Sequence, residues 1–178
     1  GEAQWTDMAV DTADTLLVRF SDQYNGGFFS TGNDAETLIT RPKDVFDNAH
    51  PSANSLAALA LLRLGALTGE GRFTDAAESV LRLLGRNAVS QPTAFGRLLE
   101  AIDLFHSGTT EVVVTGDRAD LVSAVVSSYR PNTVLAWGER RPGPLWDGRE
   151  GDQAWVCRNR TCAAPVDSVK ALLVNLGD

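Results

Sequence analysis

The stretch DNAHPSANS, residues 47–55, gathers side chains that can transfer protons. Asp47 and His50 lie three residues apart, and Asp44 lies three residues before Asp47. Paired carboxylates serve as acid and as base or nucleophile in glycoside hydrolysis, and a histidine moves protons near neutral pH. These residue types suit acid–base chemistry on a sugar, with Asp47 and His50 as candidate catalytic residues and Asp44 as a candidate binding residue.

The same stretch also has the composition of a helix start. Residues 53–67 are apolar almost all round, which is typical of a helix buried on several sides. Ser52 or Asn54 can accept from the free backbone N–H groups of its first turn, and Pro51 can fix the entry. Capping leaves the two acids and the histidine unexplained, so both interpretations stay open and Asn54 is kept as a binding candidate.

Two aromatic residues follow a glycine turn in NGGFFST, residues 25–31. Phe28 and Phe29 can offer a stacking face to a sugar ring, or they can form the local core of their loop. Both are kept as candidate binding residues.

Cys157 and Cys162 bound the segment CRNRTC. They can form a disulfide, a redox pair activated by Arg158 and Arg160, or two small thiols in the turn after a strand. Tetrahedral zinc needs four ligands and the sequence has no second cysteine pair, so no metal or other cofactor is expected.

The elements that must position these residues are helical in the first part of the chain. Apolar residues recur there at three- to four-residue spacing, which indicates amphipathic or buried helices. Four helices are predicted, at 5–20, 53–67, 73–84 and 92–105. Pro92 suits the first turn of the fourth helix, and His106 is predicted at its C-terminus, where a cation is favoured.

The pattern changes near Gly108, where short β-branched runs replace the helical spacing. Three strands are predicted at 111–116, 132–138 and 153–159, with a closing helix from Asp167 to Gly177. Asp117 can cap a helix between the first two strands, so this part predicts a right-handed βαβ unit with parallel strands.

The composition is that of an ordinary folded protein. Of 178 residues, 43% are hydrophobic and 22% charged, and 23 acidic residues outnumber 16 basic ones. The basic residues are scattered, so neither nucleic acid nor an anionic membrane surface is an expected partner. A reducing cytoplasm is the expected location, because two cysteines do not make a secreted disulfide framework and no apolar run approaches a membrane span.

Three segments together resemble a known family: GGFFST with RPKDVFDNAHPSANS downstream, the VVVTG strand, and the tail AWVCRNRTCAAPV. They are similar to the C-terminal part of the thioredoxin-domain-containing, spermatogenesis-associated protein 20-like family. The resemblance extends over nearly the whole chain, and the cysteine-containing tail is its most specific part.

The resemblance implies a thioredoxin-like domain followed by an (α/α)6 toroid, similar to six-hairpin glycosidases and N-acylglucosamine 2-epimerases. The chain has no C-x-x-C motif and about four hairpin-type helices, so it looks like the C-terminal portion of a larger protein. The expected fold class is α+β: a partial (α/α) hairpin toroid over 1–108, then a small α/β C-terminal subdomain over 109–178. The open edge of the helix at 53–67 is expected to favour self-association.

Two functional hypotheses follow, and the residues leave open whether the protein is an enzyme. In the first, the toroid binds or processes a small carbohydrate by acid–base chemistry. In the second, the chain is a catalytically silent protein-interaction or thiol-redox accessory module, and its cysteine pair serves a thioredoxin-like domain or partner.

Overall fold

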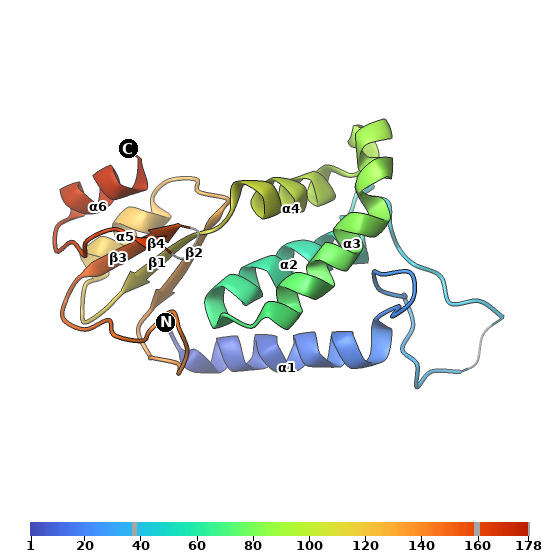
Figure 1. Cartoon of the computed structure of the whole chain (residues 1–178), viewed down its shortest axis with the longest axis horizontal. Coiled ribbons are helices and arrows are strands. Elements are labelled where there is room, and N and C mark those ends of the chain that lie inside the picture. The colour runs from blue at the N-terminus through green and yellow to red at the C-terminus, as the bar shows by residue number, and fades with distance from the viewer. Residues whose placement is uncertain (37–38, 159–160, 178) are drawn as a thin grey trace. The chain divides into compact units, whose positions relative to one another are not determined.

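The computed structural model describes residues 1–36, 39–158 and 161–177, and the fold class is α+β, as expected (Figure 1). The chain divides into two compact units. A helical unit comprises Asp7–Gly65 and Glu70–His106, and a sheet unit comprises Gly1–Thr6, Ala66–Gly69 and Ser107–Asp178.

The helical unit contains the four predicted helices. They are α1 (Ala3–Phe20), α2 (Ala53–Thr68), α3 (Gly71–Ser90) and α4 (Gly96–Ser107), with a short 3-10 turn, η1 (Pro92–Ala94), before α4. Figure 1 shows α2 and α3 as a hairpin of adjacent helices. His106 lies in the last turn of α4, as predicted.

The spacing of apolar residues explains how these helices share one core. On α3 the buried positions recur every three to four residues, which produces a single apolar stripe: Phe73, Ala77, Val80, Leu84 and Ala88. On α2 the buried positions are spread around the helix, at Ala58, Leu59, Leu61, Leu62 and Leu64. The core therefore surrounds α2 on several sides and meets α3 on one, as the sequence predicts.

The start of the fourth helix differs from the prediction. Pro92 begins the separate turn η1 rather than the first turn of α4. Phe95 breaks the helical path between them, with φ −140° and ψ 33°, and its side chain is fully buried. Burial of this ring accompanies the break and moves the helix start to Gly96.

The sheet unit contains the predicted βαβ unit. Its elements are β1 (Thr110–Val114), α5 (Ala119–Val126), β2 (Thr133–Trp137), β3 (Ala154–Arg158), β4 (Thr161–Cys162) and α6 (Val169–Leu176). β1 and β2 are parallel, whereas β3 is antiparallel to β1 and β4 is antiparallel to β3. The sheet is thus mixed, in the order β2-β1-β3-β4. Asn159, the last residue of the predicted third strand, lies outside the described residues.

Different elements cover the two faces of this sheet. One face packs against α5 and α6, and its core includes Val112, Val114, Val156, Leu121 and Leu172. Because side chains alternate along a strand, Glu111, Trp155 and Cys157 belong to the opposite face. The loop between β2 and β3 meets that face.

Of the two helix caps predicted in the sheet unit, the structure confirms the one at the end of α6 and contradicts the one at the start of α5. Gly177 ends α6 in the left-handed conformation, with φ 94°, as predicted. Ser168 caps the start of α6, and its hydroxyl accepts from the Ala171 N–H. The prediction that Asp117 caps α5 is wrong: Arg118 occupies the N-cap position, and its guanidinium donates to Asp120.

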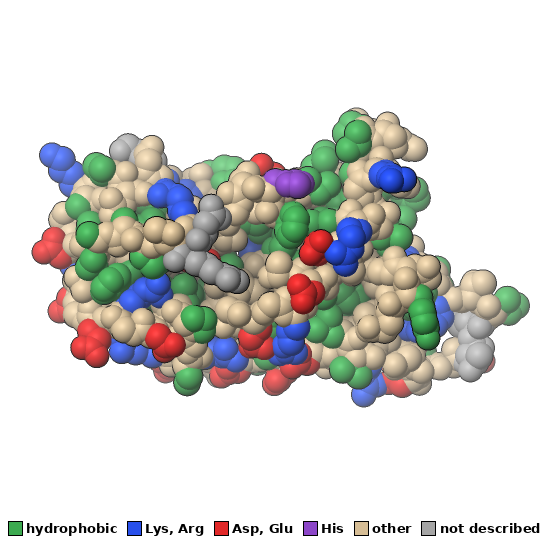
Figure 2. Space-filling view, in the orientation of Figure 1, with side chains coloured by type: hydrophobic (Ala, Val, Ile, Leu, Met, Phe, Trp, Pro, Cys, Tyr) green, Lys and Arg blue, Asp and Glu red, His purple; other side chains and the backbone are tan. Residues whose placement is uncertain are grey.

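Charges are mixed over the surface seen in Figure 2, where acidic and basic side chains are interspersed. Within the described ranges, no helix is both long enough and apolar enough to cross a membrane.

Candidate functional site

Asp47 joins the starts of two helices. One carboxylate oxygen accepts from the Ser52 N–H at 2.8 Å, next to the start of α2. The other accepts from the N–H groups of Arg97 and Leu98, at 2.8 and 3.2 Å, in the first turn of α4. The carboxylate therefore satisfies free donors at both helix N-termini, where a negative charge is favoured.

These bonds determine the protonation of Asp47. Partial burial by itself raises the pKa of the carboxyl, but the N–H groups of Ser52, Leu98 and Arg97 and the Ser55 hydroxyl outweigh it and hold the pKa below the ordinary value of 3.8. Asp47 is thus ionised near neutral pH and carries no proton to donate as a general acid.

Asp44 and Ser52 cap α2 together. Asp44 accepts from the Ala53 N–H at 2.8 Å, and the Ser52 hydroxyl accepts from the Ser55 N–H at 3.2 Å. The sequence predicted that Ser52 or Asn54 caps this helix, and the bond from the Ser55 N–H assigns the cap to Ser52, whose side chain is buried.

His50 is exposed, and its carbonyl accepts from the Asn48 N–H at 3.0 Å. Among the described residues, no hydrogen bond joins the His50 ring to Asp47 or Asp44. The structure therefore uses the two acids as helix caps and gives the histidine no part in that arrangement.

Asn54 fastens the glycine turn to α2. Its side chain is fully buried, accepts from the Phe28 N–H at 2.8 Å and donates to the Phe28 carbonyl at 2.9 Å. Phe28 itself is 2% exposed and belongs to the helical core. Asn54 and Phe28 therefore hold the loop in place, which matches the structural interpretation for Phe28.

Phe29 lies beneath two cations that the sequence did not single out. The Arg41 guanidinium and the Lys43 ammonium lie 4.2 and 5.0 Å from its ring centroid. Lys43 also forms an ion pair with the largely buried Asp22 at 2.8 Å, and this bond lowers the pKa of Asp22 far below its ordinary value. The sequence did not reveal this ion pair, because Asp22 and Lys43 are too far apart in the chain to be neighbours on one helix or strand.

A hollow of about 320 Å³ lies between α1 and α2. Its lining is almost wholly apolar: Met8, Ala9, Thr12, Ala13, Leu16, Ala57, Ala60, Leu61 and Leu64. None of the candidate residues from Asp44 to Asn54 lines it.

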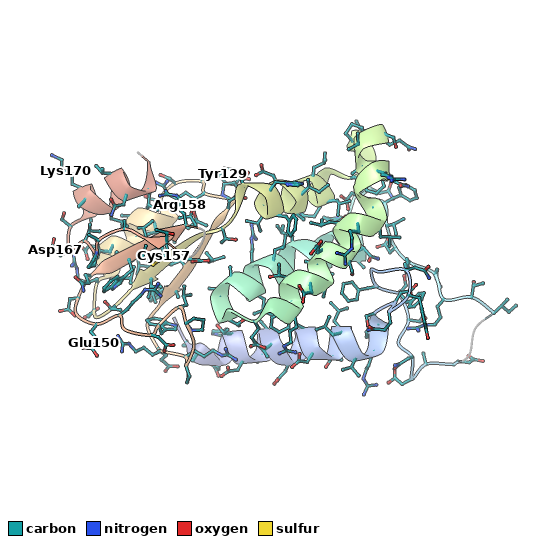
Figure 3. The ribbon with its side chains drawn as sticks, in the orientation of Figure 1. Tyr129, Glu150, Cys157, Arg158, Asp167 and Lys170 are labelled. Carbon is teal, nitrogen blue, oxygen red and sulfur yellow. A yellow bond between two sulfur atoms is a disulfide. The ribbon has the colours of Figure 1, made fainter. Side chains whose placement is uncertain are left out.

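Cys157 and Cys162 form a disulfide across neighbouring strands. They are direct partners in the register of β3 and β4. Cys157 is 1% exposed, whereas Cys162 is exposed on the edge strand. Figure 3 shows Cys157 on the sheet. Of the alternatives that the sequence left open, the structure has the disulfide rather than two separate thiols, because the register of β3 and β4 brings the two side chains together.

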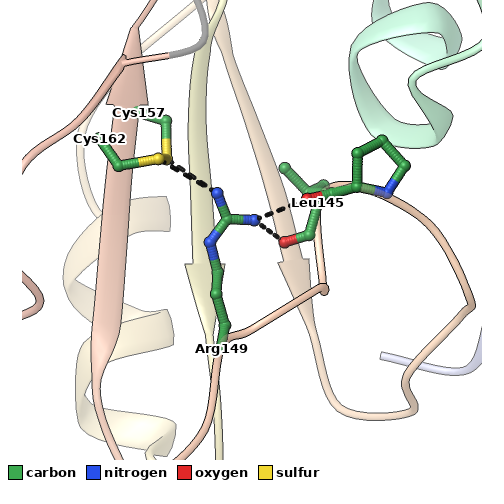
Figure 4. The surroundings of a disulfide bond; sticks show 5 residues. Leu145, Arg149, Cys157 and Cys162 are labelled. Carbon is green, nitrogen blue, oxygen red and sulfur yellow. Dashed lines mark hydrogen bonds between the residues drawn. A yellow bond between two sulfur atoms is a disulfide. The ribbon is translucent and has the colours of Figure 1, made fainter.

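Arg149 contacts both sulfur atoms of this disulfide. One guanidinium nitrogen lies 3.1 Å from Cys157 Sγ and 3.2 Å from Cys162 Sγ, and another donates to the Leu145 carbonyl (Figure 4). The sequence pointed instead to two other arginines. Arg158 donates to the Asn175 carbonyl at 3.0 Å, and Arg160 lies outside the described residues.

Arg149 is partly withdrawn from solvent. Burial lowers the pKa of its guanidinium, while the charges of Glu111 and Asp147 act in the opposite direction. An arginine nevertheless stays charged at any physiological pH. The disulfide therefore faces a fixed positive charge.

Across the described ranges, no cluster of three or more His, Cys, Asp or Glu residues could hold a metal ion.

Comparison with known proteins relates the chain to one group. Spermatogenesis-associated protein 20 from Homo sapiens is 31% identical to it, with 93% of the chain covered. The chain is a relative of spermatogenesis-associated protein 20. The proteins of that name from Rattus norvegicus and Mus musculus are 29% and 28% identical over the same share. No protein-family model matches.

The match confirms the family resemblance of the three sequence segments. The chain spans 23% of the length of spermatogenesis-associated protein 20 from each species. The similarity therefore concerns one part of those longer proteins.

Proposed function

We propose that this chain is a thiol–disulfide exchange module whose redox centre is the Cys157–Cys162 bond. The observation that carries the proposal is the contact of the Arg149 guanidinium with both sulfur atoms of the disulfide. One cysteine of that disulfide, Cys162, is exposed. A positive charge beside a cysteine stabilises the thiolate, which is the form that takes part in exchange.

Exposure of Cys162 supports the same function. Exchange requires a thiolate to reach one sulfur of the disulfide, and structural disulfides are usually shielded from such attack. Cys162 lies on the edge strand β4, which has a sheet neighbour on one side only. The bond is thus open to a partner on the side away from β3.

A thioredoxin-like domain or protein is the proposed partner. The family resemblance implies such a domain in longer relatives, and this chain has no C-x-x-C pair of its own. In this proposal the dithiol of that partner reduces Cys157–Cys162, and the helical unit has no catalytic role.

Acid–base chemistry on a carbohydrate stays a prediction, as does a partial (α/α) toroid over residues 1–108. The bonds of Asp47 and Asp44 to backbone N–H groups favour capping over catalysis, and His50 shares no hydrogen bond with them in the described structure. We therefore do not propose the sugar reaction as the function.

The test uses reduced thioredoxin, kept reduced by its reductase and NADPH, with the chain as the disulfide substrate. We expect NADPH oxidation stoichiometric with the chain, because the chain holds one disulfide. The Cys157→Ser variant should abolish this consumption, and His50→Ala, which leaves both cysteines intact, should preserve it. A wild-type chain that consumes no NADPH would refute the proposal.

A further inference from the structure

We infer that the two cysteines have unequal roles: Cys162 is the sulfur that an incoming thiolate attacks, and Cys157 is the leaving thiolate that Arg149 holds. This inference rests on the proposed exchange function and specifies its chemistry. Three observations carry it: the unequal exposure of the two cysteine residues, the guanidinium that lies beside the buried one, and the charges around that guanidinium.

Access distinguishes the two sulfurs. An attacking thiolate approaches a disulfide along the line of the bond, from the side opposite the leaving sulfur. Cys157 is 1% exposed on the inner strand β3, whereas Cys162 is exposed on β4. A thiolate from solvent or from another protein can therefore reach Cys162, while the sheet and the loop around Arg149 shield Cys157.

The leaving thiolate needs a stabilising charge because it forms in a buried place. Burial raises the pKa of a cysteine, and a poor leaving thiolate slows exchange. Arg149 lies 3.1 Å from Cys157 Sγ and 3.2 Å from Cys162 Sγ, so access rather than the guanidinium distinguishes the two sulfurs. At the buried sulfur, Cys157 Sγ, the guanidinium supplies a permanent positive charge and an N–H donor. Arg149 is thus a positioning residue for the thiolate.

The guanidinium is held in place before any reaction. It donates to the Leu145 carbonyl, and the Arg149 carbonyl in turn accepts from Arg140. Leu145 is buried, at 5% exposure, so its carbonyl is part of a fixed loop. Little reorganisation is needed when the charge on Cys157 develops, which is the condition under which a fixed donor stabilises it most.

Other charged groups face this place from neighbouring elements of the described structure. Glu111 is the register partner of Cys157 on β1, and Asp147 in the loop acts on the Arg149 charge. Arg158 belongs to the opposite face of β3, because successive side chains alternate. Arg149 therefore favours the Cys157 thiolate and Glu111 opposes it, so the two residues should shift its pKa in opposite directions.

Reduction of the disulfide by a partner dithiol takes two successive exchange steps. The thiolate of a partner dithiol forms a bond to Cys162 Sγ, the Cys162–Cys157 bond breaks, and its electron pair leaves on Cys157 Sγ beside Arg149. The second thiolate of the partner then attacks the partner sulfur bound to Cys162 and releases the Cys162 thiolate. The partner dithiol is oxidised to a disulfide, and the chain is reduced by two electrons.

The first experiment maps the attacked sulfur. The oxidised chain is mixed with reduced glutathione, quenched with acid at early times, and digested for mass spectrometry. We expect glutathione predominantly on Cys162. Predominant attachment to Cys157 would overturn the inference while leaving exchange itself intact, whereas a chain that forms no adduct and resists thioredoxin would refute the proposed function.

The second experiment measures the Cys157 thiol pKa by thiolate absorbance, in a Cys162→Ser background. Arg149→Gln should raise this pKa by about one unit, an approximately tenfold smaller thiolate fraction near neutral pH. Glu111→Gln should lower it, and Arg158→Gln, the matched control, should leave it unchanged. An unchanged pKa in Arg149→Gln overturns the inference. If that variant does not fold, Glu111→Gln decides, and an unchanged pKa there overturns it as well.

Discussion

At the scale of single residues, Asp47 shows how a catalytic residue type can be used for structure. Its carboxylate accepts from three backbone N–H groups at the starts of α2 and α4. We predict that Asp47→Ala lowers the free energy of unfolding by about 1–3 kcal/mol, because it leaves these donors without their charged acceptor.

Urea unfolding followed by circular dichroism measures this loss. His50→Ala is the matched control, since an exposed side chain in the same segment should change the free energy by less than about 0.5 kcal/mol. Equal effects of the two substitutions would contradict the capping role of Asp47.

The acids of the helical unit also predict how its stability depends on pH. The pKa values of Asp47 and Asp22 are lowered in the folded chain, so the unfolded chain binds more protons in acid. Their contribution to stability is fully present above the ordinary carboxyl pKa of 3.8 and is lost as the pH falls through the lower folded values. Stability should therefore fall below about pH 4.

Thermal unfolding across the acid range checks this slope. The double variant Asp22→Asn, Asp47→Asn should be less stable near neutral pH and should have a flatter acid dependence than the wild type. A double variant with the same acid dependence as the wild type would contradict the assignment of these two carboxyls.

Residue types predicted part of this site. Ser52 or Asn54 was expected as a cap from its place at the start of an apolar run, and the structure gives this role to Ser52. The role of Asp47 in α4 was not accessible, because Arg97 lies fifty residues further along the chain. Arg149 was missed for the same reason: its contact with the cysteines depends on the fold of a loop, and no local period signals it.

At the scale of elements, the glycine turn and helix α3 offer a paired test. Gly27 has φ +70°, and a Cβ there would lie 2.8 Å from Asn54 Oδ1. We predict that Gly27→Ala costs about 1–3 kcal/mol of stability, because it imposes strain and disturbs the Asn54 bonds to Phe28.

Gly85 is the matched control within α3. An added Cβ meets nothing within 4 Å there, so Gly85→Ala should stabilise the helix by about 0.5–1 kcal/mol. Calorimetric melting of both variants checks the pair. A Gly27→Ala variant as stable as the wild type would contradict the fastening of the turn by Asn54.

Element type followed from apolar spacing, whereas element boundaries did not. The long stripe of α3 has one clear period, and β1 and β2 are short apolar runs rich in β-branched residues; the predicted type is confirmed for all three. The boundary at Pro92 failed because Phe95 leaves the helical path with its ring buried in the core. The orientation of β3 was not specified by its sequence, since a short apolar strand fits either direction.

At the scale of the whole molecule, the chain is related to one part of spermatogenesis-associated protein 20. It matches 23% of the length of the human protein. Self-association through the α2 helix stays a prediction, and sedimentation at increasing concentration would test it. The proposed exchange function concerns only the sheet unit, because both cysteines and Arg149 belong to it.

A redox titration of the Cys157–Cys162 bond tests the central claim most directly. The chain is equilibrated in buffers of defined thiol–disulfide potential, and its free thiols are alkylated and counted by mass. We predict a midpoint above about −300 mV, in the range of exchanging disulfides, because Cys162 is exposed and Arg149 stabilises the reduced form. A bond that stays oxidised well below that potential would show a purely structural disulfide and contradict the account.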